Sequence, residues 1–528
     1  MNFFERMNFK DLVVPLSLAL LTTWGLHYFF FSKNSEETGI RAGQSFVAPK
    51  NKQELKPLNT EVDFIDVQRP GFATRTEVET HGARLIFSTD GASLESLEFK
   101  HLAGCPACPL STIEAPAEVD KAARCFLVAL DHETPYYYTL VSRQDVGDTT
   151  ELLYQADFPK GSIQKKYTVH KDTYKIDLEI KLEPQNPETS KLEPRIFFSS
   201  PFVAPIEQTD VVSAIVSNEK GSLDKVGRDR LTVGQGWFSP RLFGTDDRYF
   251  VNALVEDAQG FVQRAYYKFA DKTKLTSILE GPAVGLKTET CCNQWKLSFY
   301  FGPKESAAFA KVDNRLEQTL DYAGFFAPIS KFLLAVLRML YSYLKNYGFA
   351  IIAMTFLVKL VLLPFSYGAE DSMQKRADFD KKLRHIQQKY KNEPDMLAQE
   401  RAALIQKHGM PGLSGCLPLL LQVPIFIALS RVLSSAIELY QAPFIGWIHD
   451  LSVRDPYFVL PIVTALGMIF QTAQKPGNDP KQQLSTVVMA LVIGAVTANL
   501  AAGLALYICM FTWLGIAQTK LLAKFKRS

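Results

Sequence analysis

Long apolar stretches in the last third of the chain most strongly limit what it can fold into. Residues 347–365, 416–437 and 456–473 are each long enough to cross a bilayer, whose hydrocarbon core is about 30 Å thick. The run 484–518 would make a single helix of about 52 Å, so it predicts two spans with a turn near Asn499–Gly503. These stretches predict five transmembrane helices.

A further apolar run near the start of the chain, 12–31, follows Arg6 and Lys10. A cleaved signal peptide and an uncleaved membrane anchor both fit its length and position. The run ends in "HYFFF", which is bulky and lacks a small-x-small cleavage site. We therefore predict an anchor over 1–32, which brings the number of spans to six.

The charges of the connecting segments predict how these spans are oriented. Segment 370–413 is rich in Lys and Arg, whereas the next connection has only Arg454. The following one contains Lys475 and Lys481, and the C-terminal tail is basic again. Cytoplasmic loops carry the excess of Lys and Arg. The pattern predicts cytoplasmic N- and C-termini, and it places the large segment between the first two spans on the other side of the membrane.

That large segment, 61–325, follows a polar stretch, 33–60, which reads as a flexible linker. Its short segments alternate apolar and polar residues, as "YKIDLEIKLEP" shows most clearly. Such a period of two is typical of strands with one wet face. We predict a mostly antiparallel β-sandwich outside the cytoplasm, closed by a helix near 305–320. The fold class is thus a multi-domain membrane protein with six transmembrane α-helices.

Between the β domain and the second span, residues 326–346 predict an amphipathic helix. Lys331, Arg338 and Lys345 recur every seven residues and form a basic stripe opposite an apolar face. An ordinary packed helix would show the same pattern. Its place just before a span favours a helix lying in the membrane interface.

The cytoplasmic segment 370–410 predicts a hairpin of two amphipathic helices with a break at "NEP", 392–394. Its basic and acidic residues are typical of a solvated face, although contact with RNA or a partner protein stays open. The apolar positions that we single out are Met373, Ile386, Tyr390 and Leu404.

Polar residues inside the predicted spans are the candidate functional residues. Lys359 lies in the second span, where a central charge costs roughly 2.5–3.5 kcal/mol. Its side chain either extends to the cytoplasmic surface or lines a wet cavity. Arg431 either reaches the outer interface or faces a partner in the bundle. Thr355 and Gln422 are further polar positions in the second and third spans.

The sequence gives no indication of an enzyme, a metal site or a cofactor. "GLSG" resembles the surroundings of an intramembrane protease serine, Ser414, but such a serine needs a histidine within reach. His449 lies beyond the far end of that span. The net charge of +3 gives no indication about nucleic acid, and we predict no sequence-specific nucleic-acid partner.

Most of the cysteines lie in segment 61–325. "CPAC" would fit a structural disulfide, a redox pair or free thiols, and its loop-like surroundings disfavour redox chemistry. The cysteines whose state the sequence leaves open are Cys105, Cys108, Cys125, Cys291 and Cys292.

Several stretches resemble the YidC membrane protein insertase family in its Gram-negative form. "NYGFAIIAMTFLVKLVLLPF" is similar to the family's second span and "GCLPLLLQVPIFIALSRVL" to its third. "FGPKESAAF" and "LDYAGFFAPIS" resemble the end of the periplasmic domain and the interfacial helix. The resemblance covers nearly the whole chain.

The resemblance implies an insertase and chaperone of the bacterial inner membrane. It implies a hydrophilic groove, open to the cytoplasm and to lipid, with Lys359 at the family's basic position and Thr355, Gln422 and Arg431 as polar groove positions. The hairpin 370–410 would receive the substrate. Partners would be nascent membrane proteins, the Sec translocon and the lipid bilayer, with weak ribosome binding because the tail is short.

Three departures from the family are visible. Lys359 stands where many members have arginine. Lysine keeps the positive charge but lacks the rigid guanidinium group with its five hydrogen-bond donors. Tyr440 stands where a basic residue is common, and "NLAAGLALY" replaces a turn that usually contains proline. The alternatives from other classes are a small-solute transporter and an envelope scaffold with a periplasmic ligand-binding domain. Transporters usually show internal repeats, and these spans show none.

Overall fold

The computed structural model describes most of the chain after residue 56. The described residues are 57–65, 72–100, 110–113, 124–130, 134–185, 192–201, 212–217, 221–232, 235–269, 274–285, 293–320, 326–391, 393–408, 417–473 and 480–527. The predicted N-terminal span, 12–31, and the linker lie outside them. The described part forms two compact units, one rich in strands and one helical.

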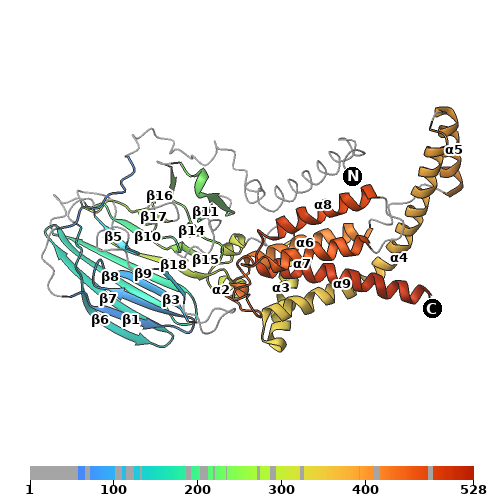
Figure 1. Ribbon diagram of the computed structural model, residues 1–528. Coiled ribbons are helices and arrows are strands. Elements are labelled where there is room, and N and C mark those ends of the chain that lie inside the picture. Colours follow the sequence, from blue (N-terminus) through green and yellow to red (C-terminus); the bar gives the residue numbers. More distant parts are fainter. Residues whose placement is uncertain are drawn as a thin grey trace. The chain divides into compact units, whose positions relative to one another are not determined.

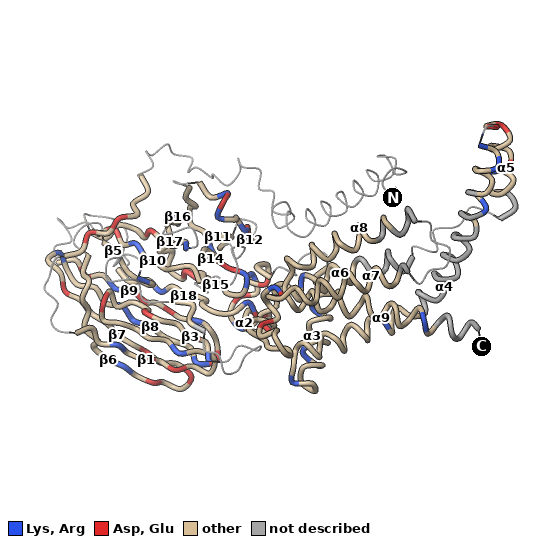
Figure 2. Tube along the Cα trace, in the orientation of Figure 1, with Lys and Arg blue, Asp and Glu red and all other residues tan. Residues whose placement is uncertain are grey.

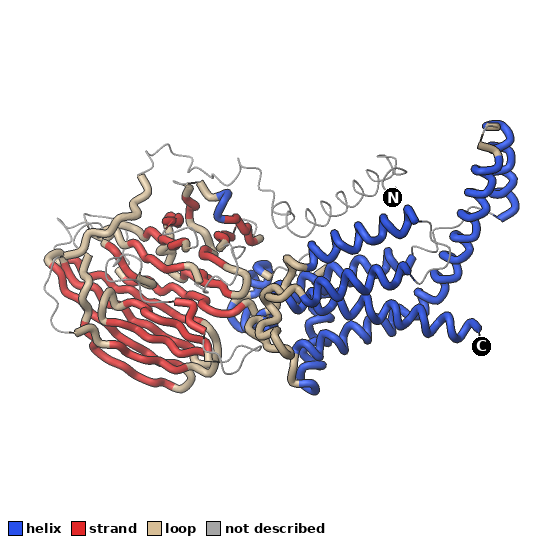
Figure 3. Tube along the Cα trace, viewed as in Figure 1, coloured by secondary structure: helices blue, strands red, loops and turns tan. Residues whose placement is uncertain are grey.

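The β-rich unit contains three sheets within the described residues, and every strand pairing in them is antiparallel (Figures 1 and 3). In spatial order, the largest sheet consists of β12 (Leu223–Gly227), β11 (Ser213–Ser217), β14 (Phe243–Asp246), β15 (Phe250–Asp257), β18 (Gln294–Pro303), β9 (Lys175–Pro184), β8 (Gly161–His170), β7 (Thr149–Phe158) and β6 (Thr139–Val146).

Two smaller sheets complete this unit. One consists of β1 (Arg75–Glu79), β2 (Ala83–Ser88), β3 (Ser93–Phe99) and β4 (Leu110–Ile113). The other, in spatial order, consists of β13 (Gly236–Phe238), β16 (Arg264–Phe269), β17 (Leu275–Glu280), β10 (Arg195–Ser199) and β5 (Leu127–Ala129). Side chains from all three sheets share one hydrophobic core, among them Phe87, Leu178 and Phe198.

The alternating stretch quoted above is strand β9. Ile176, Leu178 and Ile180 are buried in the core, as the period of two predicts. Asp177 lies on the opposite face of the strand, where the alternation predicts solvent-exposed side chains, but it is buried. Its carboxylate is buried because His170 and Ser298, on the neighbouring strands β8 and β18, hydrogen-bond to it. Those bonds outweigh its burial and hold the pKa of Asp177 well below its usual range.

A fully buried lysine lies in the middle of strand β8. Lys165 has no exposed surface, and its ammonium donates to the carbonyl oxygens of Gly91 (2.9 Å), Ala92 (2.6 Å) and Phe126 (2.6 Å). Ala92 and Phe126 both have positive φ values, of 40° and 64°, which are uncommon for residues with a side chain. Lys165 therefore connects the backbone at Ala92 and at Phe126, both with positive φ, to strand β8 of the large sheet through hydrogen bonds.

A second buried charge lies where the last strand of the domain ends. Lys304 follows β18 and pairs with Asp246 of β14 at 2.6 Å, and both side chains are almost completely buried. Lys304 also donates to the carbonyl of Thr319. Thr319 ends the short helix η5 (Asn314–Thr319), which follows α2 (Ser306–Val312). These two helices occupy the segment near 305–320 where the sequence predicts a closing helix.

One short stretch of this unit comes from much later in the chain. Residues Ser435–Ala442, which include the short helix η7 (Ile437–Leu439), belong to the β-rich unit. Ile437 and Tyr440 are part of its hydrophobic core, and the Tyr440 ring lies 4.7 Å from that of Tyr249. Tyr440, the residue that departs from the family pattern, is thus a core residue.

The helical unit follows residue 325 and returns after residue 442. Its helices are α3 (Ala327–Leu344), α4 (Tyr347–Lys389), α5 (Pro394–His408), α6 (Leu417–Ser435), α7 (Val459–Ala473), α8 (Pro480–Thr497) and α9 (Ala502–Arg527). The connection between α8 and α9 lies in the predicted turn near residues 499–503. Figure 2 shows few charged residues along α6, α7 and α8, in contrast to α5, which carries both signs.

Helix α4 differs from the prediction of a span followed by a separate hairpin helix. It is continuous over 43 residues, through Pro364, and so includes both the second apolar stretch and the first arm of the hairpin. A helix of this length measures about 64 Å, twice the thickness of a bilayer core. Helix α4 ends at Lys389 and α5 begins at Pro394, so the interruption agrees with the predicted break at "NEP", 392–394.

Within the described residues, two helical segments are long and apolar enough to cross a membrane, Ala327–Leu344 and Ala502–Leu521. Four shorter apolar helices are Tyr347–Leu363, Pro424–Ser435, Val459–Gln471 and Val487–Thr497. Helix α3, for which the sequence predicts an interfacial position, passes this test of length and composition. The number of six spans stays a prediction.

Candidate substrate site

The side chain of Lys359 points from α4 toward α9 within the helical unit. Its Nζ lies 3.4 Å from the centre of the Phe511 ring, a cation–π contact. One turn further along α9, the absence of a side chain at Gly515 leaves room for the ammonium. A Cβ at that position would lie 3.4 Å from Nζ. Lys359 is half-buried, and no carboxylate of the described residues lies within salt-bridge distance of it.

Thr355 lies one turn before Lys359 on the same side of α4. It is fully buried, and its hydroxyl donates to the carbonyl of Ile351 at 2.7 Å. This donor is therefore used inside the helix, and only the acceptor capacity of the oxygen remains for another group. The structure places Thr355 beside Lys359 as the helical spacing requires.

The other predicted groove positions lie on α6. Gln422 is in its first half, where the structure does not describe side chains. Arg431 is partly buried in the second half. The two positions are about 13 Å apart along the helix axis. The contacts of Lys359 described above are with α9, so they do not join it to either residue of α6.

The predicted hairpin positions are only partly covered by other residues. Ile386 and Tyr390, near the end of α4, and Leu404 in α5 are each partly exposed, and the Lys389 ammonium lies 5.0 Å from the Tyr390 ring centre. Met373 lies in α4 outside the described side chains. The hairpin thus leaves apolar surface accessible.

Phe511 and Gly515 are the two site residues that sequence reasoning missed. They are four residues apart, so they share one face of α9. An aromatic residue and a glycine at this spacing are common in membrane helices, and nothing in the sequence indicates which face meets Lys359. Only the packing of α4 against α9 identifies them.

We expect Gly515→Leu to lower the insertion activity that the resemblance implies about tenfold, because a branched side chain needs the space that the Lys359 ammonium occupies. Gly515→Ala should keep more than half of the activity, since its Cβ would be at ordinary contact distance. Both variants can be compared by protease protection of a single-span substrate in liposomes. Equal activity of the two variants would contradict a role for this space.

Groups that could bind a metal or act as nucleophiles can be located only within the described residues. No group of three His, Cys, Asp or Glu residues there could hold a metal. Cys125 is a free thiol, and its burial raises the pKa to about 12, which makes it unreactive. Ser414 and the other cysteines of the β domain lie outside the described residues. His449 is exposed.

Two family profiles cover most of the chain. The family described as "YidC periplasmic domain" matches residues 75–336, and that described as "60Kd inner membrane protein" matches residues 339–528. The chain resembles a crystal structure of an active YidC insertase with its first transmembrane domain resolved. The TM-score is 0.38 and the identity 17%, over 87% of this chain and 95% of that one.

Curated relatives agree with these profiles. The membrane protein insertase YidC of Bordetella petrii is 30% identical over 461 residues, which are 84% of this chain and 81% of that protein. The corresponding protein of Helicobacter pylori is 31% identical over 398 residues, which are 74% and 69% of the two chains. The chain therefore belongs to the YidC family of membrane protein insertases, inner-membrane proteins with a β-rich periplasmic domain.

Proposed function

We propose that this chain inserts membrane proteins by admitting a short hydrophilic segment of a nascent chain to a polar site around Lys359. The apolar segments are then released into lipid, by this protein alone or beside the Sec translocon. The observation that supports this most is a half-buried ammonium in an apolar helix, held over the Phe511 ring without a described carboxylate nearby.

The energetics of this cation favour a functional role. An ammonium in the middle of a membrane helix costs roughly 2.5–3.5 kcal/mol, and the cation–π contact offsets about 2 kcal/mol or less of it. A carboxylate that entered the site would remove much of the rest. Acidic and polar segments of a substrate would therefore be attracted to Lys359, which lowers the barrier for moving them into the bilayer.

The residues around this cation extend the proposal. We assign Thr355, Gln422 and Arg431 to the polar lining, and we assign the hairpin 370–410, with its partly exposed Ile386, Tyr390 and Leu404, to the first contact with the substrate. Helix α4 connects the two regions without a break. Unlike the planar guanidinium of arginine, the lysine ammonium is a compact charge that does not form bidentate contacts. The proposal therefore requires only that Lys359 attracts negative charge.

The proposed arrangement follows the charge pattern of the sequence. It has six spans including 12–31, cytoplasmic termini, domain 61–325 in the periplasm, helix 326–346 at the interface, and an insertase core over 347–528. We assign weak ribosome contact to the basic residues that follow Lys520. No cofactor or nucleotide is needed, because no covalent bond is formed or broken.

The proposal can be tested with purified protein in liposomes, in which a small single-span protein with an acidic leading segment is synthesised. We expect Lys359→Ala to lower protease protection of the substrate about tenfold, the effect of about 1.4 kcal/mol. Lys359→Arg should keep the activity. Lys520→Ala is the matched control, because that lysine also lies over a ring, Phe470 at 4.9 Å, but near the exposed end of α9.

Different outcomes separate the parts of the proposal. Full protection with Lys359→Ala would leave the insertase function and remove the role of the cation. Protection no better than in empty liposomes would contradict unaided insertion, and adding the Sec translocon would then show whether it is required. A neutral leading segment should reduce the difference between the natural chain and Lys359→Ala.

A further inference from the structure

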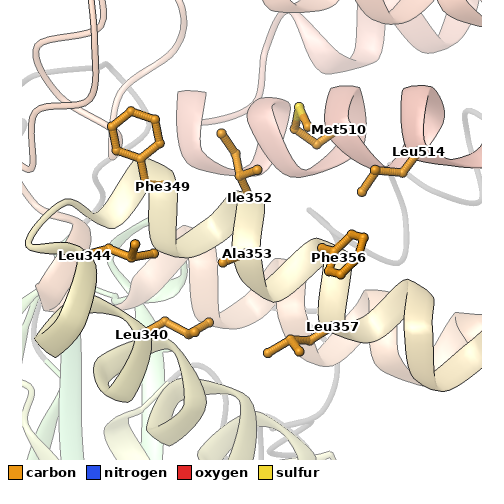
Figure 4. A pocket seen from close by; sticks show the side chains of 9 residues that line it. All are labelled: Leu340, Leu344, Phe349, Ile352, Ala353, Phe356, Leu357, Met510 and Leu514. Carbon is orange, nitrogen blue, oxygen red and sulfur yellow. The ribbon is translucent and has the colours of Figure 1, made fainter. Parts of the chain in front are cut away.

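A cleft with a volume of about 440 Å³ lies between helices α3, α4 and α9 (Figure 4). Every residue that lines it is apolar. The lining consists of Leu340 and Leu344 of α3, Phe349, Ile352, Ala353, Phe356 and Leu357 of α4, and Met510 and Leu514 of α9. The cleft contains no group that could hydrogen-bond a peptide backbone, so its ligand must be a hydrocarbon chain or an apolar side chain.

The dimensions of the cleft fit one leaflet of a bilayer. Its lining on α4 extends from Phe349 to Leu357, about 12 Å of helix. Half of the hydrocarbon core measures about 15 Å. Phe349 and Phe356 are 45% and 55% exposed, so the cleft is open along its side. A flexible chain can therefore enter it laterally from lipid.

A basic residue and several tyrosines lie at the N-terminal end of α4, where the cleft begins. Lys345 directly follows the lining residue Leu344 and ends α3 in a left-handed conformation, with φ of 56° and an exposed side chain. The rings of Tyr341 and Tyr347 stack at 3.9 Å, and Tyr343 is 80% exposed. Tyrosine is enriched at the level of lipid headgroups, which places Lys345 at that level.

We propose that this cleft binds an anionic phospholipid, with an acyl chain against Phe349–Leu357 and the headgroup phosphate at Lys345. An extended lysine offers three donors to a phosphate, and the exposed Lys345 has no carboxylate within salt-bridge distance among the described residues. Lys331 and Arg338 follow the same side of α3 at seven-residue intervals and add positive charge along it. The inference assumes that α4 crosses the bilayer, and it does not depend on the role of Lys359.

The test uses the full-length protein in liposomes without a nascent chain. Photoactivatable phosphatidylglycerol and phosphatidylcholine with identical acyl chains are compared, and labelled peptides are mapped by mass spectrometry. We expect phosphatidylglycerol to label the peptides with residues 340–357 and 510–514 about fivefold more than phosphatidylcholine does. Lys345→Gln should abolish this preference, and Lys345→Arg should keep it.

A second pair of variants tests the acyl part. Ala353→Trp fills the cleft and should reduce labelling by both lipids several-fold. Leu491→Trp is its control, since Leu491 is 60% exposed on α8 away from the cleft residues. If the cleft peptides are labelled no more than those around Leu491, the lipid is an ordinary member of the surrounding bilayer and the proposal is wrong. Displacement of the label by the apolar segment of a stalled nascent chain would assign the cleft to the substrate instead.

Discussion

Lys165→Ala is expected to lower the free energy of unfolding of the β-rich domain by at least about 3 kcal/mol. The ammonium satisfies the carbonyls of Gly91, Ala92 and Phe126 in a place that solvent does not reach. Each buried acceptor that loses its donor costs about 1–3 kcal/mol, and the alanine leaves a cavity in addition. Lys165→Met would keep the packing of the stem and so isolate the hydrogen-bond contribution.

Hydrogen–deuterium exchange of the full-length protein in detergent can measure this loss, through the opening free energy of peptides from β3 and β8. Lys166→Ala is the control, because the neighbouring side chain points to the other face and forms a partly exposed pair with Glu151. It should cost less than about 1 kcal/mol. Equal protection in the Lys165 and Lys166 variants would show that the three carbonyl contacts contribute little.

Lys304→Ala is expected to cost about 3–5 kcal/mol, because it leaves Asp246 charged, buried and incompletely paired. The Asp246 side chain is fully buried, and one of its oxygens already has no hydrogen-bond partner. The substitution also removes the bond to Thr319, which fixes the end of η5. We therefore expect faster amide exchange in both β14 and η5.

A second lysine on the same carboxylate provides the comparison. Lys225 lies 2.9 Å from Asp246, but its side chain is 31% exposed, so Lys225→Ala should cost about 1 kcal/mol or less. The double variant Asp246→Leu with Lys304→Met should regain most of the stability lost by Lys304→Ala, since no buried charge remains. Failure of the double variant to recover would mean that the bond to Thr319 dominates.

The architecture of the β-rich domain follows in large part from local patterns. The alternation in β9 predicts which residues enter the core, and the same alternation in β8 places Lys165 between the buried Ile163 and Tyr167. The partners of Lys165 are backbone carbonyls about forty to seventy residues earlier in the chain. The alternation of side chains in β8 does not indicate which distant backbone carbonyls Lys165 will contact. The sequence therefore does not predict the hydrogen bonds of this buried lysine.

The continuity of α4 could not be predicted because a proline and a change of composition both suggest a boundary. Pro364 removes one backbone hydrogen bond, and the residues beyond it change from apolar to charged. The helix nevertheless continues to Lys389, since the charged part keeps a strong helical propensity. The composition of α4 changes along its length while its helical conformation does not, so composition alone suggests a boundary that the backbone lacks.

In the candidate site, one residue could be predicted from the sequence and its neighbours could not. Lys359 is conspicuous in the sequence because a charge in an apolar stretch is costly unless the fold supplies it with water or a partner. Phe511 and Gly515 are ordinary residues of α9, and their role depends on Lys359 of α4, about 150 residues earlier in the chain. Sequence reasoning therefore finds the charged residue and misses its surroundings.

The stretch Ser435–Ala442 has a consequence for the order in which this protein can be made. Ile437 and Tyr440 complete a hydrophobic core whose other residues all precede position 302. A ribosome adds about 5–20 residues per second, so Tyr440 is synthesised roughly 7 to 28 seconds after Phe301. During that interval the helices α3 to α6 are synthesised, while the core beside Tyr249 lacks the ring that fills it. The β-rich domain thus reaches its final packing only after the helices α3 to α6 have been synthesised, so completion of its core depends on a later part of the chain.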